Sequence, residues 1–180
     1  MILLISGTTH TGKTLLAQHL LEKTGCSYLS MDHLKMGLIR SGMTDLTPQD
    51  DDTLADFLWP ILREIIKTAI ENRQNLILEG CYVPFDWRKE FTADYLRDIH
   101  DLWLVMSSDY IRTHLRDIEA HGCDIEQRLE NHVDPDSLIQ ENRKILAGCR
   151  ENGCTYFLID QAYPMDLADQ TLNQIRKGER

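Results

Sequence analysis

The chain has 180 residues, which is enough for one domain with a sizeable core. Hydrophobic residues make up 42% and charged residues 27%, as in ordinary soluble globular proteins. The net charge of −10 argues against a nucleic-acid surface that works by bulk electrostatics.

Targeting and redox signals are weak in this sequence. No apolar run approaches the ~20 residues that a membrane-spanning helix needs, and no leader precedes the first apolar run, so we expect a cytoplasmic protein with no membrane segment. None of the cysteines forms a Cys-x-x-Cys pair, which favours reduced thiols over a zinc site. The five are Cys26, Cys81, Cys123, Cys149 and Cys154.

The first stretch of the chain carries the strongest motif. Residues 2–5 form a short apolar run, as a buried strand requires, and residues 15–21 have apolar positions on one helical face. Between them lies Gly7-Thr8-Thr9-His10-Thr11-Gly12-Lys13-Thr14, which has the spacing Gly-x-x-x-x-Gly-Lys-Thr. Strand, glycine loop and helix in this order predict a phosphate-binding loop.

The residue types of this loop suit a nucleotide triphosphate. Gly7 and Gly12 let the backbone approach a ligand closely, and the following helix, with Leu15 in its first turn, offers amide groups to phosphate. The ammonium group of Lys13 can reach the outer phosphates, and the hydroxyl group of Thr14 can hold Mg²⁺. His10 lies inside the loop, where it shapes the loop or faces solvent.

The rest of the chain alternates strand and helix signals. Thr47-Pro48-Gln49-Asp50 resembles a helix start with Thr47 as the cap, and Pro60 should kink or split the helix that follows. Ser107 or Ser108 can cap a later helix, and Asp134-Pro135-Asp136 begins another. We expect further strands at 27–30, 76–78, 102–106 and 156–159, and helices over 32–41, 47–70, 85–97, 108–118, from 135 onward and 166–176.

This alternation predicts an α/β fold with a parallel sheet covered on both faces. Ligands of such sheets bind at the carboxyl ends of the strands, so the loops there should open on one edge. These loops are 7–14, 30–33, 79–82, 107–109 and 160–164.

Together these residues resemble the P-loop kinases of the nucleoside-monophosphate-kinase type, which include shikimate, gluconate and adenylate kinases. Besides the glycine loop, Ser30-Met31-Asp32-His33-Leu34 is similar to the acidic motif after the second strand of small-metabolite kinases. Leu78-Glu79-Gly80 is similar to the acidic-glycine pair after the third strand, and residues 79–84 are similar to the 2-phosphoglycerate-kinase-like branch. Residues 160–164, which include Gln161, stand where such kinases lay a loop against the adenine.

The resemblance implies a three-layer P-loop fold with a five-stranded parallel sheet and a small lid. We therefore expect one domain over 1–180, with a candidate lid at 122–133 and a candidate acceptor-binding region at 32–60. It also implies ATP and Mg²⁺ as cofactors. Two departures concern the acceptor: the arginine nearest to the acidic-glycine pair is Arg88, and the candidate lid has only Arg128.

Two carboxylates have alternative interpretations. Asp32 could be the base that takes a proton from the acceptor hydroxyl group, or only a helix cap. Glu79 ends a buried strand, where a carboxylate could hold Mg²⁺ or make a structural salt bridge.

The arginines give the candidate cations for the transferring phosphate. Arg112 and Arg116 lie one helical turn apart, so an anion between them or neighbouring acids must relieve their repulsion. Both readings stay open, and the resemblance slightly favours Arg116 as a phosphate ligand. Arg128 in the lid and Arg143 on the next helix complete the set.

The sequence thus predicts ATP- and Mg²⁺-dependent transfer of the γ-phosphoryl group to a small hydroxylated or phosphorylated metabolite. The partners would be ATP and that acceptor, with no nucleic acid and no membrane, in a monomer or homodimer. One alternative is a nucleoside-monophosphate kinase. Another, from a different class, is a regulatory protein that hydrolyses ATP slowly.

Overall fold

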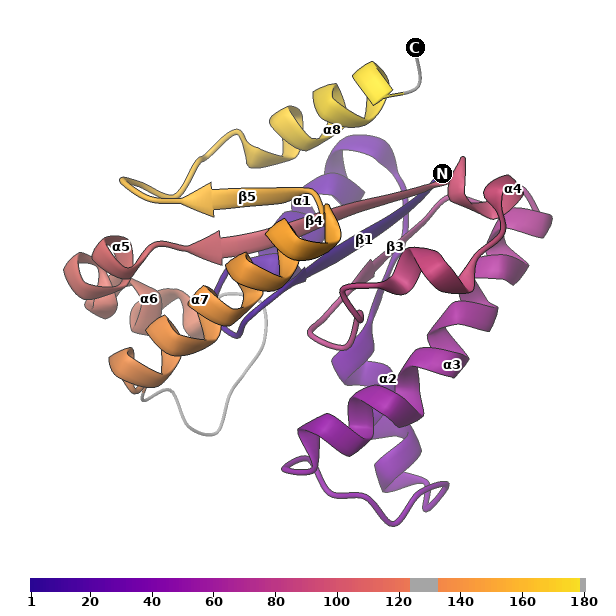
Figure 1. Ribbon diagram of the computed structural model, residues 1–180, viewed down its shortest axis with the longest axis horizontal. Helices are drawn as coiled ribbons and strands as arrows, with labels where there is room; N and C mark the ends of the chain where they lie inside the picture. Colours follow the sequence, from indigo (N-terminus) through magenta and orange to yellow (C-terminus); the bar gives the residue numbers. More distant parts are fainter. Residues whose placement is uncertain (124–132, 179–180) are drawn as a thin grey trace.

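A computed structural model of the chain describes residues 1–123 and 133–178, and all structural statements below concern these residues. Five parallel strands form one sheet in the order β2-β3-β1-β4-β5 (Figure 1). The strands are β1 (Ile2–Gly7), β2 (Tyr28–Ser30), β3 (Leu76–Glu79), β4 (Ile99–Met106) and β5 (Tyr156–Ile159). The predicted five-stranded parallel sheet is confirmed.

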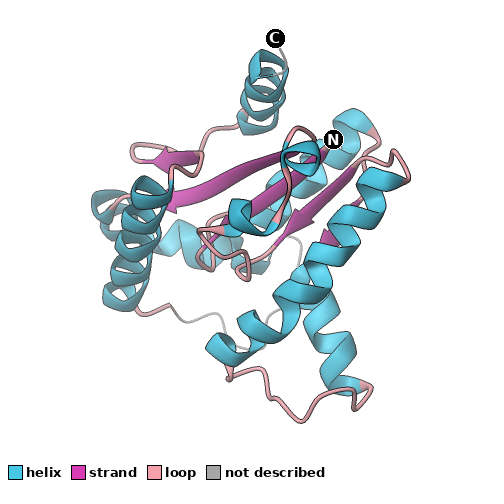
Figure 2. Cartoon of the chain, turned by 45° about the vertical axis from the view of Figure 1, so that its right-hand side comes forward, coloured by secondary structure: helices cyan, strands magenta, loops and turns pink. Residues whose placement is uncertain are grey.

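The strand β1 lies in the middle of the sheet, and both of its faces are buried. Leu3 and Ile5 pack with apolar residues of α1 (Lys13–Thr24) and α8 (Leu167–Gly178) on one face of the sheet. Ile2 and Leu4 pack against α3 (Asp51–Glu71) on the other face. Figure 2 shows the helices on both sides of the strands. The three layers predicted from the all-apolar strands are confirmed.

The remaining helices are short or lie at the edge where the strands end. Ser107 caps α5 by accepting a hydrogen bond from the amide of Tyr110, and Asp134 caps α7 by accepting one from Ser137, as their positions predicted. The elements are α2 (Met31–Arg40), α4 (Ala93–Leu96), α5 (Ser108–Thr113), α6 (Leu115–Ala120), α7 (Pro135–Asn152) and the 3₁₀ turns η1 (Trp87–Glu90) and η2 (His121–Cys123).

Several helices differ from the prediction. The helix α3 begins at Asp51, not at Thr47, because the carboxylate of Asp50 accepts hydrogen bonds from the amide and hydroxyl groups of Thr47 and closes a separate turn. Pro60 does not split α3, which continues to Glu71; the proline lies on the exposed side of the helix. The segment 85–97 forms only η1 and α4, and the segment 108–118 is divided between α5 and α6, each in place of one helix.

Strand β4 begins three residues earlier than the apolar run predicted, at Ile99. The polar residue Asp101 is buried inside it, where its carboxylate accepts hydrogen bonds from Arg88 at 2.6 Å, from the indole of Trp103 at 3.2 Å and from the amide of Thr155 at 3.1 Å. A buried carboxylate is tolerated when it is paired in this way. Arg88 thus has a structural partner away from the glycine loop.

The strand register brings the predicted loops to one edge. Gly7 lies opposite Leu104, and Glu79 lies between Ile5 and Ser30 in adjacent strands. Most of the candidate lid, 124–132 with Arg128, lies outside the described residues. Within the described ranges, no helix is both long enough and apolar enough to cross a membrane.

Candidate active site

The backbone of the glycine loop takes conformations that glycine permits. Gly7 has φ 138° and Gly12 has φ 81°, and a Cβ atom on Gly7 would lie 2.3 Å from the carbonyl oxygen of Leu104. His10, at φ 62°, adopts the left-handed region without being glycine. The loop is therefore held in a specific shape between β1 and the start of α1.

The carbonyl oxygen of Thr8 organises the side chains of the loop. It accepts hydrogen bonds from Lys13 Nζ at 2.6 Å and from Thr11 Oγ1 at 2.9 Å. Thr8, Thr11 and Lys13 are all buried, and the first turn of α1 contains no acidic residue that would oppose an anion. The ammonium group and the helix amides thus form a cationic site for phosphate.

Two oxygen ligands meet beside this loop. The hydroxyl group of Thr14 donates a hydrogen bond to the carboxylate of Glu79 at 3.3 Å, and Glu79 is 1% exposed. Behind it, Gly80 has φ 157°, and a Cβ atom there would lie 2.6 Å from Cβ of Met31. Hydroxyl and carboxylate oxygens suit Mg²⁺, which usually takes one or two protein ligands and completes its shell with water and substrate phosphates. The described residues contain no cluster of three or more His, Cys, Asp or Glu side chains that could hold a metal alone.

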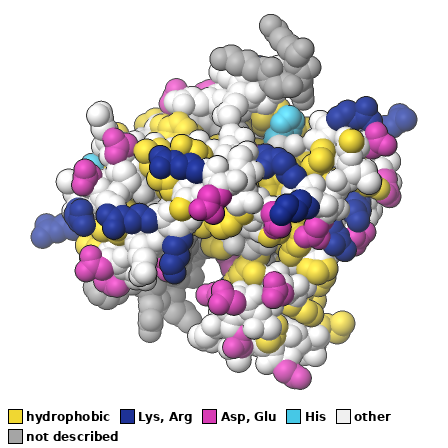
Figure 3. Space-filling model, viewed as in Figure 1, with side chains coloured by type: hydrophobic (Ala, Val, Ile, Leu, Met, Phe, Trp, Pro, Cys, Tyr) yellow, Lys and Arg dark blue, Asp and Glu magenta, His cyan; other side chains and the backbone are white. Residues whose placement is uncertain are grey.

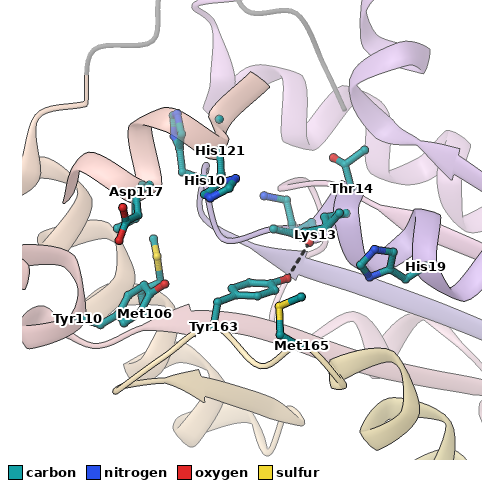
Figure 4. Close-up of a pocket in the computed structure, with 14 residues that line it drawn as sticks. His10, Lys13, Thr14, His19, Met106, Tyr110, Asp117, His121, Tyr163 and Met165 are labelled. Carbon is teal, nitrogen blue, oxygen red and sulfur yellow. Dashed lines mark hydrogen bonds between the residues drawn. The ribbon is translucent and has the colours of Figure 1, made fainter. Parts of the chain in front are cut away.

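A cavity of about 390 Å³ opens from the glycine loop (Figure 4). Its apolar lining residues include Met106, Tyr110, Ile118, Tyr163 and Met165, and Tyr163 packs against the cluster that contains the first three. Further lining residues are His10, Gly12, Lys13, Thr14, Leu15, His19, Asp117, His121 and Gly122. A cavity with apolar walls that ends at a phosphate loop has the shape and chemistry for a base and its ribose.

Tyr163 joins this cavity to the loop. Its hydroxyl group donates a hydrogen bond to the carbonyl oxygen of Gly12 at 3.4 Å (Figure 4), and a Cβ atom on Gly12 would lie 2.4 Å from that hydroxyl oxygen. Burial raises the pKa of Tyr163 to about 12, so the phenol stays neutral at physiological pH. Gly12 is therefore needed both for its backbone angle and for the close approach of Tyr163.

On the other side of the loop, α2 carries Asp32 in its first turn. One of its oxygens lies 2.7 Å from Lys35 Nζ, which also donates to the hydroxyl group of Tyr82 at 2.8 Å. That hydroxyl group donates to Asp51, the first residue of α3, at 3.1 Å. We call Asp32, Lys35, Tyr82 and Asp51 the α2–α3 network.

The charges of this network are fixed by its geometry. Burial opposes the charge on Lys35, but its bonds to Asp32 and Tyr82 outweigh that cost and raise its pKa above the ordinary value. Burial raises the pKa of Tyr82 to about 12, although Lys35 acts in the opposite direction. Lys35 is therefore a cation that is already paired, and Tyr82 a neutral bridge. Asp32 has 42% of its side chain exposed.

Of the predicted arginines within the described residues, Arg112, Arg116 and Arg143 are all exposed. Arg112 and Arg116 are exposed and belong to two separate helices, α5 and α6, and neither these two nor Gln161 is among the described residues that line the cavity. Arg112 lies 3.8 Å from Asp109, and Arg143 donates to the hydroxyl group of Ser108 at 3.2 Å. The neighbouring acid that could relieve the Arg112–Arg116 repulsion is thus present.

Sequence reasoning missed several residues of this site. Tyr163 lies in the loop that was expected to contact the base, but the tyrosine itself was not singled out. Lys35 lies within the candidate acceptor-binding region 32–60, but no local pattern shows that it pairs with Asp32 and Tyr82. Asn142, which is buried and contacts Thr8, was not noticed. Its position on α7 between the buried Leu138 and Cys149, four and seven residues away, was the available signal.

Comparison with known proteins supports the fold at low sequence identity. A scan against family models and a search of curated proteins found no match. Among solved structures, a gluconokinase from Sinorhizobium meliloti is 18% identical, with 97% of this chain and 91% of that chain covered and a TM-score of 0.53. A shikimate kinase from Acinetobacter baumannii, in complex with shikimate, is 18% identical over 99% and 94% of the two chains, with a TM-score of 0.57.

A deoxyadenosine kinase from M. mycoides is 14% identical, with 98% of this chain and 100% of that chain covered and a TM-score of 0.60. The chain therefore has the fold of small P-loop kinases, as the resemblance implied.

Proposed function

We propose that the protein transfers the γ-phosphoryl group of ATP, with Mg²⁺, to a hydroxyl group of a small metabolite. The observation that carries this proposal is the arrangement at the sheet edge: a buried Lys13 in the glycine loop, Thr14 against Glu79, and Asp32 on the neighbouring helix. Phosphoryl transfer needs little more from a protein than positioning and charge compensation at this place. The kinases that share the fold support the same reaction class.

The nucleotide would lie with its triphosphate on residues 7–15 and its base in the apolar cavity lined by Tyr110, Ile118 and Tyr163. Lys13 would pair with the outer phosphate oxygens. Arg116, next to the cavity residue Asp117, is our candidate for a second cation at the transferring group, and Arg128 remains a further candidate. Arg112 and Gln161 would be further contacts to the nucleotide at the rim of the site.

The metal would be held by Thr14 and Glu79. When bound, Mg²⁺ neutralises charge on the phosphate oxygens. The chain supplies two groups for the metal, the hydroxyl group of Thr14 and the buried carboxylate of Glu79. Each would bind the metal directly or through water. This donor set matches a cation that is shared with substrate phosphates.

Glu79→Gln should raise the Mg²⁺ concentration needed for half-maximal ATP turnover by about 10-fold or more, because outer-shell and ligand changes of this kind weaken metal sites by about 10–100-fold. Activity measured over a Mg²⁺ titration at saturating ATP tests this. Glu22→Gln, on the exposed face of α1, is the control and should behave as wild type. An unchanged Mg²⁺ dependence in Glu79→Gln would leave Glu79 with a structural role only.

The acceptor is inferred from the charged side chains of α2, α3 and the turn η1. Lys35 is paired with Asp32, Arg88 with Asp101, and Arg63 with Glu90 at 2.5 Å. The candidate acceptor-binding region 32–60 contains six aspartates against one lysine, Lys35, and one arginine, the exposed Arg40 in the last turn of α2. Figure 3 agrees, because acidic side chains gather on the lower part of the face shown, where Figure 1 places α2 and the start of α3.

A monophosphate acceptor brings a dianion, which calls for cations that are not already paired. The α2–α3 network instead offers carboxylates and a neutral phenol, which suit hydroxyl groups. We therefore propose an acceptor with an alcohol group and no phosphate, and we place the nucleoside-monophosphate kinase second.

The test is ADP release over a panel of nucleosides, sugars and sugar acids, amino alcohols, phosphoglycerates and nucleoside monophosphates. We expect stimulation by at least one unphosphorylated alcohol. Stimulation by a monophosphate alone would promote the nucleoside-monophosphate kinase. Slow ATP hydrolysis that no compound stimulates would favour the regulatory protein.

A further inference from the structure

Helix α7 carries one polar side chain on its buried face. Asn142 is 2% exposed and lies between the buried residues Leu138, Ile139 and Cys149 of the same helix. A buried amide in an apolar layer costs free energy unless all of its groups are hydrogen-bonded. Asn142 meets that condition with partners on three separate elements.

Both ends of the amide are used. Oδ1 accepts a hydrogen bond from the amide of Met106, at the end of β4, at 2.7 Å. Nδ2 donates to the carbonyl oxygen of Leu138 at 2.8 Å and to Thr8 Oγ1, in the glycine loop, at 3.0 Å. Because a backbone N–H only donates and a carbonyl only accepts, these two partners fix the orientation of the amide and leave one Nδ2 hydrogen for Thr8.

The bond to Thr8 reaches the residue that holds the catalytic lysine. The hydroxyl group of Thr8 accepts a hydrogen bond from Asn142, and its carbonyl oxygen accepts hydrogen bonds from Lys13 Nζ and Thr11 Oγ1. Asn142 thus ties the loop to both β4 and α7. All four side chains are buried, so water does not compete for these bonds.

We propose that Asn142 is a positioning residue for phosphoryl transfer: it fixes Thr8, and through Thr8 the ammonium group of Lys13, relative to the sheet. This inference rests on the proposed function, because a role in phosphoryl transfer requires that the loop binds ATP. The hydrogen bonds of Asn142 do not depend on that function. It assigns a role in ATP binding to a residue that would itself touch no substrate.

The chain provides a matched control. Asn152, at the end of the same helix, donates from Nδ2 to the carbonyl oxygen of Gly148 at 2.9 Å, four residues back, just as Asn142 does to Leu138. Within the described residues, the hydrogen bond of its side chain does not reach the glycine loop. Asn142→Ala and Asn152→Ala therefore each remove a bond to the carbonyl oxygen four residues back, and only Asn142→Ala also removes the bonds to Met106 and Thr8.

Two measurements apply to these variants. Calorimetric titration with MgATP should show affinity lowered by about 10–100-fold in Asn142→Ala, by analogy with outer-shell residues that orient metal ligands, and unchanged affinity in Asn152→Ala. Hydrogen exchange of the ligand-free proteins should show faster exchange of the 7–13 amides in Asn142→Ala alone. Equal MgATP affinity in Asn142→Ala and wild type, with equal exchange, would overturn the proposal.

A second variant covers the case in which Asn142→Ala does not fold. Thr8→Val removes the accepting hydroxyl group, together with that group's own bond to the carbonyl oxygen of Thr9 at 3.3 Å, and keeps the other two bonds of Asn142, so it should also speed exchange at 7–13 and weaken MgATP binding. Where both variants fold, their effects on affinity should be clearly less than additive, because they break the same bond. Additive effects, or a Thr8→Val protein with wild-type exchange and affinity, would contradict the proposal. A wild type that binds no MgATP would refute the proposed function, whereas the exchange result would still decide the role of Asn142 in shaping the loop.

Discussion

Lys13→Ala should lower turnover of MgATP by about 10²–10³-fold while the protein keeps its fold. Lys13 Nζ is buried in the glycine loop and is held by the carbonyl oxygen of Thr8 at 2.6 Å. Its charge is therefore already in place before the reaction, and loss of one such preorganised group has cost about 2.7–4 kcal/mol of transition-state stabilisation in an enzyme where it was measured. Steady-state rates at saturating Mg²⁺, with circular dichroism to check folding, measure the effect.

Lys23→Ala is the control for this prediction. Lys23 lies in the last turn of the same helix α1, and its ammonium group pairs with Asp169 on α8 at 2.9 Å, with about half of both side chains exposed. Exposed pairs of this kind contribute little, so Lys23→Ala should keep wild-type turnover. A Lys13→Ala protein as active as Lys23→Ala would remove the glycine loop from the active site.

Asp32→Asn should suppress transfer to the acceptor by about 10²–10⁴-fold, the range for a positioned acid–base group, and leave the affinity for MgATP within about twofold of wild type. The reason is spatial: Asp32 belongs to α2 and the α2–α3 network, whereas the proposed MgATP contacts belong to the glycine loop and Glu79. The measurements are acceptor-dependent ADP release, with the compound that stimulates wild type most, and calorimetric titration with MgATP.

Asp56→Asn, an exposed aspartate on α3, is the matched control and should leave both quantities unchanged. Two outcomes would contradict the role of Asp32. Normal transfer would reduce it to a helix-start residue paired with Lys35, and lost MgATP affinity would move it to the nucleotide side or to the fold.

The fold could be predicted because its signals are local. Each strand is a short apolar run, and the glycine loop needs only adjacent residues to be recognised. The boundaries that failed depend on partners far away in the sequence. Asp101 is a charged residue that a buried strand does not usually contain. It is tolerated there because Arg88 and the amide of Thr155 donate hydrogen bonds to its carboxylate. Thr47 resembles a helix cap in the sequence, but in the structure its amide and hydroxyl groups donate to the carboxylate of Asp50 and form a separate turn before α3.

The candidate site divides in the same way. The sequence placed Lys13, Thr14 and Glu79 correctly at one sheet edge because parallel strands end together. It could not predict that Tyr163 contacts Gly12, 151 residues away, or that Asn142 contacts Thr8, 134 residues away. Both contacts require the packing of a loop or helix against the sheet, which no local pattern encodes. The exposed arginines could not be assigned from the sequence either, because the charge pattern does not show which arginine side chains face the cavity.

The most direct test of the account follows the γ-phosphorus of ATP by ³¹P nuclear magnetic resonance. Wild-type protein with Mg²⁺, ATP and the alcohol that stimulates ADP release most should convert the γ-phosphate resonance into a phosphomonoester resonance in equal amount to the ADP formed, and Lys13→Ala should not. Conversion to inorganic phosphate alone, or a phosphomonoester signal that persists in Lys13→Ala, would contradict the claim that this loop transfers a phosphoryl group to a metabolite.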